Sequence, residues 1–127
     1  MQLALTKQLF AISESLPLGE TFDSKGNLLS SKSADGHFVQ NTYDENGNDT
    51  SYLNSATQFL SEKTYDGNGR QLSYKDNGGG FSKCEYDENG FQTLFETGRF
   101  DKVHLWWKKT YDKNGNVLTA DGNDSIK

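Results

Sequence analysis

The sequence has only one cysteine and one proline among its 127 residues. It is therefore poor in the residues that cross-link small domains and in those that interrupt helices and strands. A single cysteine excludes an internal disulfide, so we expect a reducing compartment and interpret Cys84 as a half-buried strand residue rather than a nucleophile. The N-terminus has no basic leader and no apolar run of about 18 residues. We therefore expect a soluble, cytoplasmic protein.

Apolar residues and positive charge are also scarce. Only 32% of the residues are hydrophobic, whereas there are 13 glycines and the aromatic share is 13%. A domain of this size must then have a thin core made largely of Tyr and Phe, which favours sheet over helix. The net charge of -5, from 13 Lys+Arg against 18 Asp+Glu, argues against direct nucleic-acid binding.

What the sequence has in quantity is one short phrase. "YDENGN" at 43–48 recurs as "YDGNGR" from 65, "YDENGF" from 86 and "YDKNGN" from 111, with "FDSKGN" from 22 as a diverged copy, so the spacings are 21, 22, 21 and 25 residues. One supersecondary unit is copied at such a period. Each phrase lies between two runs of strand-forming residues, which indicates a β-hairpin. The sequence therefore predicts a mainly β protein: five hairpin repeats, about ten short antiparallel strands, over residues 19–127, after a helical segment in residues 1–18.

The pairing register follows if each Asn-Gly forms a two-residue type I′ turn. This even loop pairs Cys84 with Phe95 on a face rich in Tyr and Leu, and Lys83 with Glu96 on a polar, solvated face. The alternative is a three-residue loop with a type I turn and a glycine bulge, which shifts every pair by one and loses the charge pairing. The phrase at 24–26, "SKG", fits the even loop poorly because it lacks the Asn that tolerates positive φ.

The N-terminal segment carries a helical stripe. Its apolar residues fall at i, i+4, i+7 and i+11, namely Leu5, Leu9, Ile12 and Leu16. Pro17 and Gly19 then end the predicted helix. Since a one-layer sheet needs a cover, we expect this helix to lie on the Tyr/Leu face with a twisted sheet curling around it. A homodimer formed face to face is the other solution.

The phrase is rich in Asp and Asn but lacks the spacing of a calcium loop. An EF-hand needs Gly at its sixth position and Glu at its twelfth, and counting from Asp112 these positions hold Val117 and Asn123. His37 and His104 lie in different repeats, without the spacing of a catalytic triad. We expect no metal, no cofactor and no catalytic residue, so the protein is predicted not to be an enzyme.

The repeat loses its spacing between residues 98 and 109, where one linker is four residues longer than the others and carries adjacent tryptophans. Alternation from Tyr111 places Trp107 on the apolar face and Trp106 with Lys108 on the polar face. An exposed Trp beside basic residues is typical of a protein contact, although packing of Trp106 under the longer loop fits the same pattern. The candidate partner-binding residues are Trp106, Lys108, Arg99, Phe100, His104 and Phe81.

The phrases, together with linkers such as "SKSADGHFVQNTYDENGN" and "YKDNGGGFSKCEYDENGF", resemble the YD repeats of rearrangement-hotspot (Rhs) and teneurin-like proteins. The stretch "WWKKTYDKNGNVL" is similar to the MORN-type repeat. The resemblance implies hairpins laid side by side in a curled sheet, which in the large members forms a shell around a toxin; five repeats are too few to enclose a cargo.

Short, acidic, stand-alone forms of this kind resemble products of phages or mobile elements. The resemblance therefore implies a protein-binding inhibitor of a host defence protein, of the anti-CRISPR or other anti-defence type, and this is the expected function. The alternative is a carbohydrate- or surface-binding fragment of a secreted YD-repeat toxin system.

Overall fold

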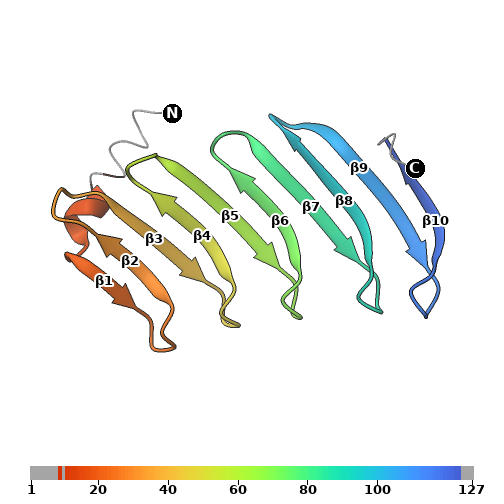
Figure 1. Cartoon of the computed structure of the whole chain (residues 1–127), viewed down its shortest axis with the longest axis horizontal. Coiled ribbons are helices and arrows are strands. Elements are labelled where there is room, and N and C mark those ends of the chain that lie inside the picture. The colour runs from red at the N-terminus through yellow and green to blue at the C-terminus, as the bar shows by residue number, and fades with distance from the viewer. Residues whose placement is uncertain (1–8, 10, 124–127) are drawn as a thin grey trace. The chain divides into compact units, whose positions relative to one another are not determined.

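The computed structural model describes Leu9 and residues 11–123, and its β-strands follow one another as an antiparallel meander whose spatial order is the chain order (Figure 1). The ten strands are β1 (Gly19–Phe22), β2 (Leu28–Lys32), β3 (Phe38–Tyr43), β4 (Asp49–Asn54), β5 (Phe59–Tyr65), β6 (Gln71–Asp76), β7 (Gly80–Tyr86), β8 (Gln92–Arg99), β9 (Lys102–Tyr111) and β10 (Val117–Gly122). The predicted mainly β, ten-strand meander is confirmed.

The chain forms two compact units, residues 1–62 and 63–127, and the boundary falls inside β5. The first unit holds β1 to β4 and the start of β5, and the second holds the end of β5 and β6 to β10. Within the described part of each unit, the pairing runs from each strand to its neighbour in the chain, and neither row closes on itself. We describe each unit by itself.

The repeated phrase forms the turn within each hairpin. In the phrase at 43–48, the amide of Gly47 donates to the carbonyl oxygen of Asp44 at 3.1 Å, and the amide of Asp44 donates to that of Asn48 at 2.9 Å. Gly47 has a φ of 87°, whereas Asn46 does not have positive φ. This is the three-residue loop, a type I turn closed by a glycine bulge, so the predicted type I′ turn is wrong.

The predicted register is nevertheless confirmed beyond the turn, because a second irregularity compensates for the first. Tyr43 pairs with Asp49 but Thr42 pairs with Ser51, so Thr50 is an extra, bulged residue. The odd loop shifts the pairing by one residue, and the bulge shifts it back by one. The predicted pairs that occur include Asn41 with Tyr52, Lys83 with Glu96, Cys84 with Phe95, Lys108 with Asp121 and Thr110 with Thr119.

The Asp of the phrase holds the turn from inside. Asp44 Oδ1 accepts hydrogen bonds from the amides of Asn46 and Asn48, both at 2.9 Å. The same two bonds form at the Asp of the other four phrases, residues 23, 66, 87 and 112. Because only the glycine needs positive φ, "SKG" makes the same turn, with a φ of 89° at Gly26.

The Tyr of the phrase ties one hairpin to the hairpin before it. The hydroxyl group of Tyr43 donates to the carbonyl oxygen of Leu28 at 2.8 Å, that of Tyr86 to Gln71 at 2.9 Å, and that of Tyr111 to Gln92 at 2.7 Å. Each acceptor lies two residues after the glycine of the preceding turn. The Tyr-Asp-x-x-Gly pattern therefore encodes both the turn and its link to the preceding hairpin.

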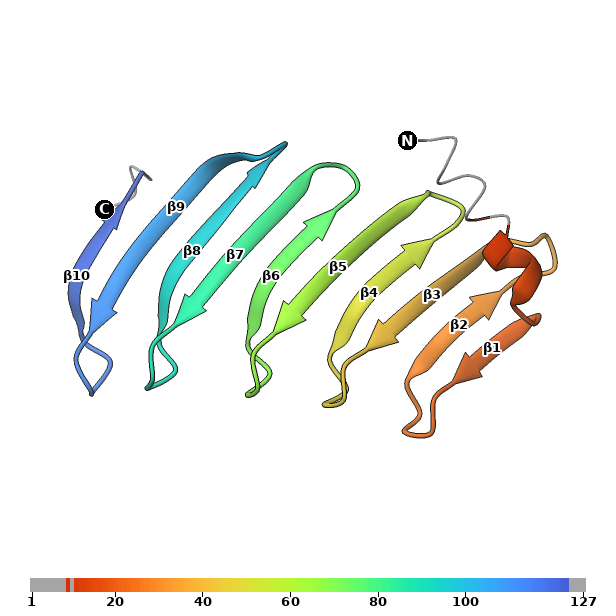
Figure 2. The ribbon, with the colours of Figure 1, turned by 180° about the vertical axis from the view of Figure 1, so that it is seen from behind.

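The N-terminal helical residues, Leu9 and 11–15, lie over β2 and β3 in the first unit (Figure 2). Leu9 (7% exposed) packs with Phe38 (3%) and Leu53 (9%), and Ile12, Leu16 and Leu60 surround them. The predicted stripe is confirmed at Leu9, Ile12 and Leu16, and Leu5 lies outside the described residues.

The face that this helix covers is not the predicted one. Leu53 pairs with Gln40, next to the Asn41 and Tyr52 pair, so Leu53 lies on the face opposite Tyr52. The physical reason is an apolar column on the nominally polar face. The residue five positions before the Tyr of each phrase is large and apolar, and we call this set the apolar column: Phe38, Leu60, Phe81 and Trp106.

Candidate binding surface

The candidate segment occupies β8, β9 and the turn between them, in the second unit. Trp107 pairs with Phe95, whereas Trp106 pairs with Glu96 and Lys108 pairs with Leu94. The prediction that the two tryptophans point to opposite faces, with Lys108 on the side of Trp106, is confirmed.

We call the surface around Trp106 the Trp106 face; its residues are Phe81, Leu94, Glu96, Trp106 and Lys108. Phe81 belongs to it because it pairs with Gly98, two residues from Glu96 on the same side of β8. Leu94 is buried, at 5% exposure, whereas Phe81 and Trp106 are half-buried. The Lys108 ammonium lies 6.0 Å from the centroid of the Trp106 ring, at the limit of a cation–π contact. The face thus combines aromatic surface with flanking charge.

The turn between β8 and β9 is a type I′ turn, the type that the sequence predicted for the repeated phrase. Arg99 pairs with Lys102, and the two residues between them, Phe100 and Asp101, have φ of 54° and 66°. For residues other than glycine this backbone costs about 1–2 kcal/mol each. Gly98 is required here, because a Cβ at this position would overlap the carbonyl oxygen of Lys102.

Two of the predicted binding residues fasten this turn to the neighbouring β6–β7 turn. The amide of Phe100 donates to the carbonyl oxygen of Gly79 at 2.9 Å, and Arg99 Nη1 donates to that of Gly78 at 3.1 Å. The Phe100 ring lies against Gly79, so closely that a Cβ added to this glycine would be 2.5 Å from the ring. Phe100 nevertheless remains 71% exposed. Arg99 therefore has an internal contact, and Phe100 combines an anchored backbone with an accessible ring.

His104 lies at a β-bulge in β9. Thr97 pairs with Leu105 and Gly98 with Val103, so His104 is the extra residue of β9. Its carbonyl oxygen accepts a hydrogen bond from Asn123 Nδ2 at 3.1 Å, and Asn123 Oδ1 accepts the amide of Trp106 at 2.8 Å. The sequence carries no signal for the role of Asn123, because an exposed Asn after a strand is common.

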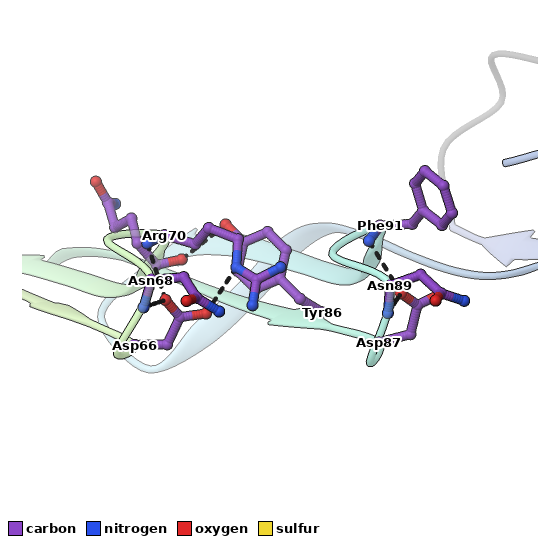
Figure 3. Close-up of polar contacts among 8 residues, drawn as sticks. Asp66, Asn68, Arg70, Tyr86, Asp87, Asn89 and Phe91 are labelled. Atoms are coloured by element: carbon purple, nitrogen blue, oxygen red, sulfur yellow. Dashed lines mark hydrogen bonds and ion pairs between the residues drawn. The ribbon is translucent and has the colours of Figure 1, made fainter. Parts of the chain in front are cut away.

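Side chains that follow the turn glycine connect successive turns in the second unit (Figure 3). Arg70 Nε lies 2.8 Å from Asp66 Oδ2, and its guanidinium lies 5.0 Å from the centroid of the Tyr86 ring. At the next turn Phe91 stacks near Tyr111, with ring centroids 5.3 Å apart. The backbone amide of Arg70, with further donors, lowers the pKa of Asp66. These contacts join each turn to the next hairpin.

The opposite face of the second unit carries Cys84, Phe95 and Trp107. The Phe95 and Trp107 rings lie 6.2 Å apart, and Lys109 Nζ lies 4.7 Å from the centroid of the Trp107 ring. Cys84 is buried in β7, and burial raises the pKa of its thiol. A thiol with a raised pKa stays protonated at neutral pH, so the interpretation of Cys84 as a packing residue is supported.

The remaining candidates form no reactive cluster. Among the described residues, no three His, Cys, Asp or Glu side chains are grouped closely enough to hold a metal ion, and no helix is long and apolar enough to cross a membrane. A shallow depression of about 260 Å³ lies beside His37 in the first unit. Its other lining residues are Ser31, Ser33, Phe38, Val39, Asn54 and Ala56.

No known family model and no curated protein matches this chain. Solved Tc toxin structures are similar to it. The crystal structure of TcdB2-TccC3-TEV is 24% identical with a TM-score of 0.61, over 82% of this chain and 5% of that chain. The Photorhabdus luminescens Tc holotoxin pore is 23% identical with a TM-score of 0.62, over 85% of this chain and 5% of that chain. The chain thus shares the fold of a small part of these toxins, and it spans only 5% of their length.

Proposed function

We propose that this chain is a structural and binding segment of a YD-repeat scaffold in a secreted toxin system, and that it acts by non-covalent contact without catalysis. The likeness in fold to a small part of Tc toxin chains supports this proposal. The repeated phrase supports it as well, because Tyr and Asp are committed to the turn and to the link with the preceding hairpin. Such side chains build a surface and are not free to react.

The observation that carries the proposal is the thinness of the core. The buried apolar side chains of the described residues are Leu9, Phe38, Leu53, Cys84 and Leu94. In the second unit this leaves Cys84 and Leu94, although the unit spans five strands. A sheet that buries so little of itself is marginal alone and is stabilised by further protein.

The type of surface is the second part of the proposal. Trp107 with Phe95 on one face, and Trp106 with Phe81 on the other, supply aromatic side chains of the kind that dominate contacts. A protein partner is the first expectation, and a sugar ring stacked on Trp107 is the alternative. A glycan array and a pull-down decide between a sugar and a protein as the ligand. Repeating each with Trp106→Ala and Trp107→Ala shows which face binds it.

Immunoblotting of the source cells and their medium tests the proposal directly. We expect antibodies against this chain to detect a secreted polypeptide much larger than 14.2 kDa. A 14.2 kDa species confined to the cytosol would overturn the proposal. That result would instead match the sequence-based prediction of a cytoplasmic phage or mobile-element inhibitor, which no contact in the described residues specifically supports.

A further inference from the structure

One backbone arrangement occurs twice in the chain. In the first unit Lys32 pairs with Phe38 across a turn in which Gly36 has a φ of 92°. In the second unit Lys75 pairs with Phe81 across a turn in which Gly79 has a φ of 91°. Each residue of the second set lies two repeats after its counterpart. Lys75, Gly79 and Phe81 therefore hold the same backbone positions in the second unit as Lys32, Gly36 and Phe38 in the first.

The first unit uses this arrangement to bind a helix. Leu9 of the N-terminal helix covers Phe38, which is only 3% exposed. Lys32 Nζ donates to the carbonyl oxygens of Ser13 and Leu16, at the C-terminal end of the helix. Ser13 Oγ donates to the carbonyl oxygen of Gly36 at 2.8 Å. All three elements of the arrangement contact the helix.

The second unit presents the arrangement without a helix in its described residues. The amide of Phe100 donates a hydrogen bond to the carbonyl oxygen of Gly79, as the hydroxyl group of Ser13 does to the carbonyl oxygen of Gly36. The members of the apolar column in this unit are Phe81 and Trp106, and both are half-buried, whereas Phe38 is buried. The apolar side chains of this part of the second unit thus remain partly exposed, and Glu96 occupies the position that corresponds to Leu53.

We propose that the Trp106 face binds an amphipathic helix supplied by a partner protein, with apolar residues at i, i+3 and i+7, the pattern of Leu9, Ile12 and Leu16. A short helix laid into an apolar surface is a common recognition mode. Trp106 and Phe81 are the anchors, and the charged residues Glu96 and Lys83 lie beside them, since Glu96 pairs with Trp106 in β9 and with Lys83 in β7. This inference rests on the repeated local geometry and does not depend on the toxin relationship.

The adjacent tryptophans allow a test in the full-length chain. The Trp107→Phe variant keeps Trp106 as its sole tryptophan, and the Trp106→Phe variant keeps Trp107 on the opposite face as a matched control. The probe is a synthetic peptide of residues 1–18, which carries the helical stripe, and the control peptide carries Ile12→Asp. We expect the first peptide to shift the Trp106 emission to the blue in a saturable way and to leave the Trp107 emission unchanged.

Three results would overturn the inference. The first is the absence of a saturable shift up to about 1 mM peptide, a range in which even weak contacts saturate. The second is an equal shift in both variants. The third is peptide binding, measured by anisotropy, without any shift of Trp106, which would place the peptide in the first unit by exchange with the chain's own helix.

A further variant tests whether Phe81 contributes to peptide binding. Phe81→Ser is expected to weaken peptide binding by at least about tenfold, as for a contact hot spot, and unchanged binding would overturn the inference. If circular dichroism shows that this variant does not fold, Trp106→Ala is measured by anisotropy against the same criterion. A cytosolic, free-standing chain would remove the proposed toxin role and leave this experiment's outcome unaffected, so the two proposals fail separately.

Discussion

The two units repeat one design and differ in what covers it. In the first unit the N-terminal helix packs on the apolar column, so Phe38 is buried, and Lys32 donates a hydrogen bond to a carbonyl oxygen of the helix. In the second unit the repeat-equivalent Phe81 is half-buried. There the β8–β9 turn contributes the backbone and ring of Phe100 at Gly79 and the guanidinium of Arg99 at Gly78. The hairpins set where an apolar side chain lies, and the segments outside the repeat decide whether it is covered.

The largest expected effect is at the equivalent aromatic residues. Phe38→Ala should lower the free energy of unfolding of the first unit by about 3–5 kcal/mol, because it empties the space under Leu9. Phe81→Ala should cost the second unit much less, since its side chain is already partly in water. Hydrogen exchange of amides in β3 and β7 measures each unit separately. Equal losses would show that the helix cover does not distinguish the units.

The turn glycines give the next effect. Gly47 and Gly115 have φ of 87° and 89°, but a Cβ at Gly47 meets nothing, whereas at Gly115 it would lie 3.1 Å from the Phe91 ring. Alanine at either position should cost about 1–2 kcal/mol from the left-handed backbone. Gly115→Ala should cost more, because Phe91 must also move. Thermal unfolding of both variants checks this, with Glu45→Ala and Lys113→Ala as controls at neighbouring turn positions, and a larger loss at Gly47 would contradict it.

A smaller, stabilising effect is expected at the linker turns. Gln58 in the first unit and Asp101 in the second have φ of 59° and 66° without being glycine. Gln58→Gly and Asp101→Gly should each relieve strain and raise stability by less than about 1 kcal/mol, because glycine also gains entropy in the unfolded chain. Urea unfolding compares the two variants. Loss of stability at Asp101 alone would show that its side chain has a role that the turn does not require.

The sequence predicted the hairpins and their register because the phrase recurs and charges pair across the strands. It predicted the turn wrongly, since an odd loop followed by a bulge at Thr50 leaves the same cross-strand pairs as an even loop. It also placed the helix on the wrong face, because the helix was assigned to the Tyr/Leu face, whereas apolar residues of the other face, such as Phe81 and Trp106, were assigned to partner binding. The contacts of Arg99 and Asn123 could not be predicted, because they join backbone groups of segments that only the fold brings together.

The smallest expected difference between the units concerns pH. Amide and side-chain donors lower the pKa of Asp44 in the first unit, led by the amide of Asn48, and that of Asp112 in the second, led by the side chain of Asn116. A carboxyl group whose pKa is lower in the folded state contributes stability above its unfolded value, and loses it as the pH falls through the folded value. Both units should therefore be fully stabilised near neutral pH and weaken below the ordinary value of 3.8.

Asp44→Asn and Asp112→Asn test this symmetry, because the amide keeps an acceptor for the turn but no longer titrates. Each variant should lose some stability at neutral pH and show a shallower loss in acid, measured as the urea midpoint of its own unit across the acid range. Glu45→Gln, at an exposed position of the turn that holds Asp44, is the matched control. Matching slopes would show that the two turns stabilise their units to the same extent through the carboxylate, whereas a slope that changes in one unit alone would show that the hairpin turns themselves differ.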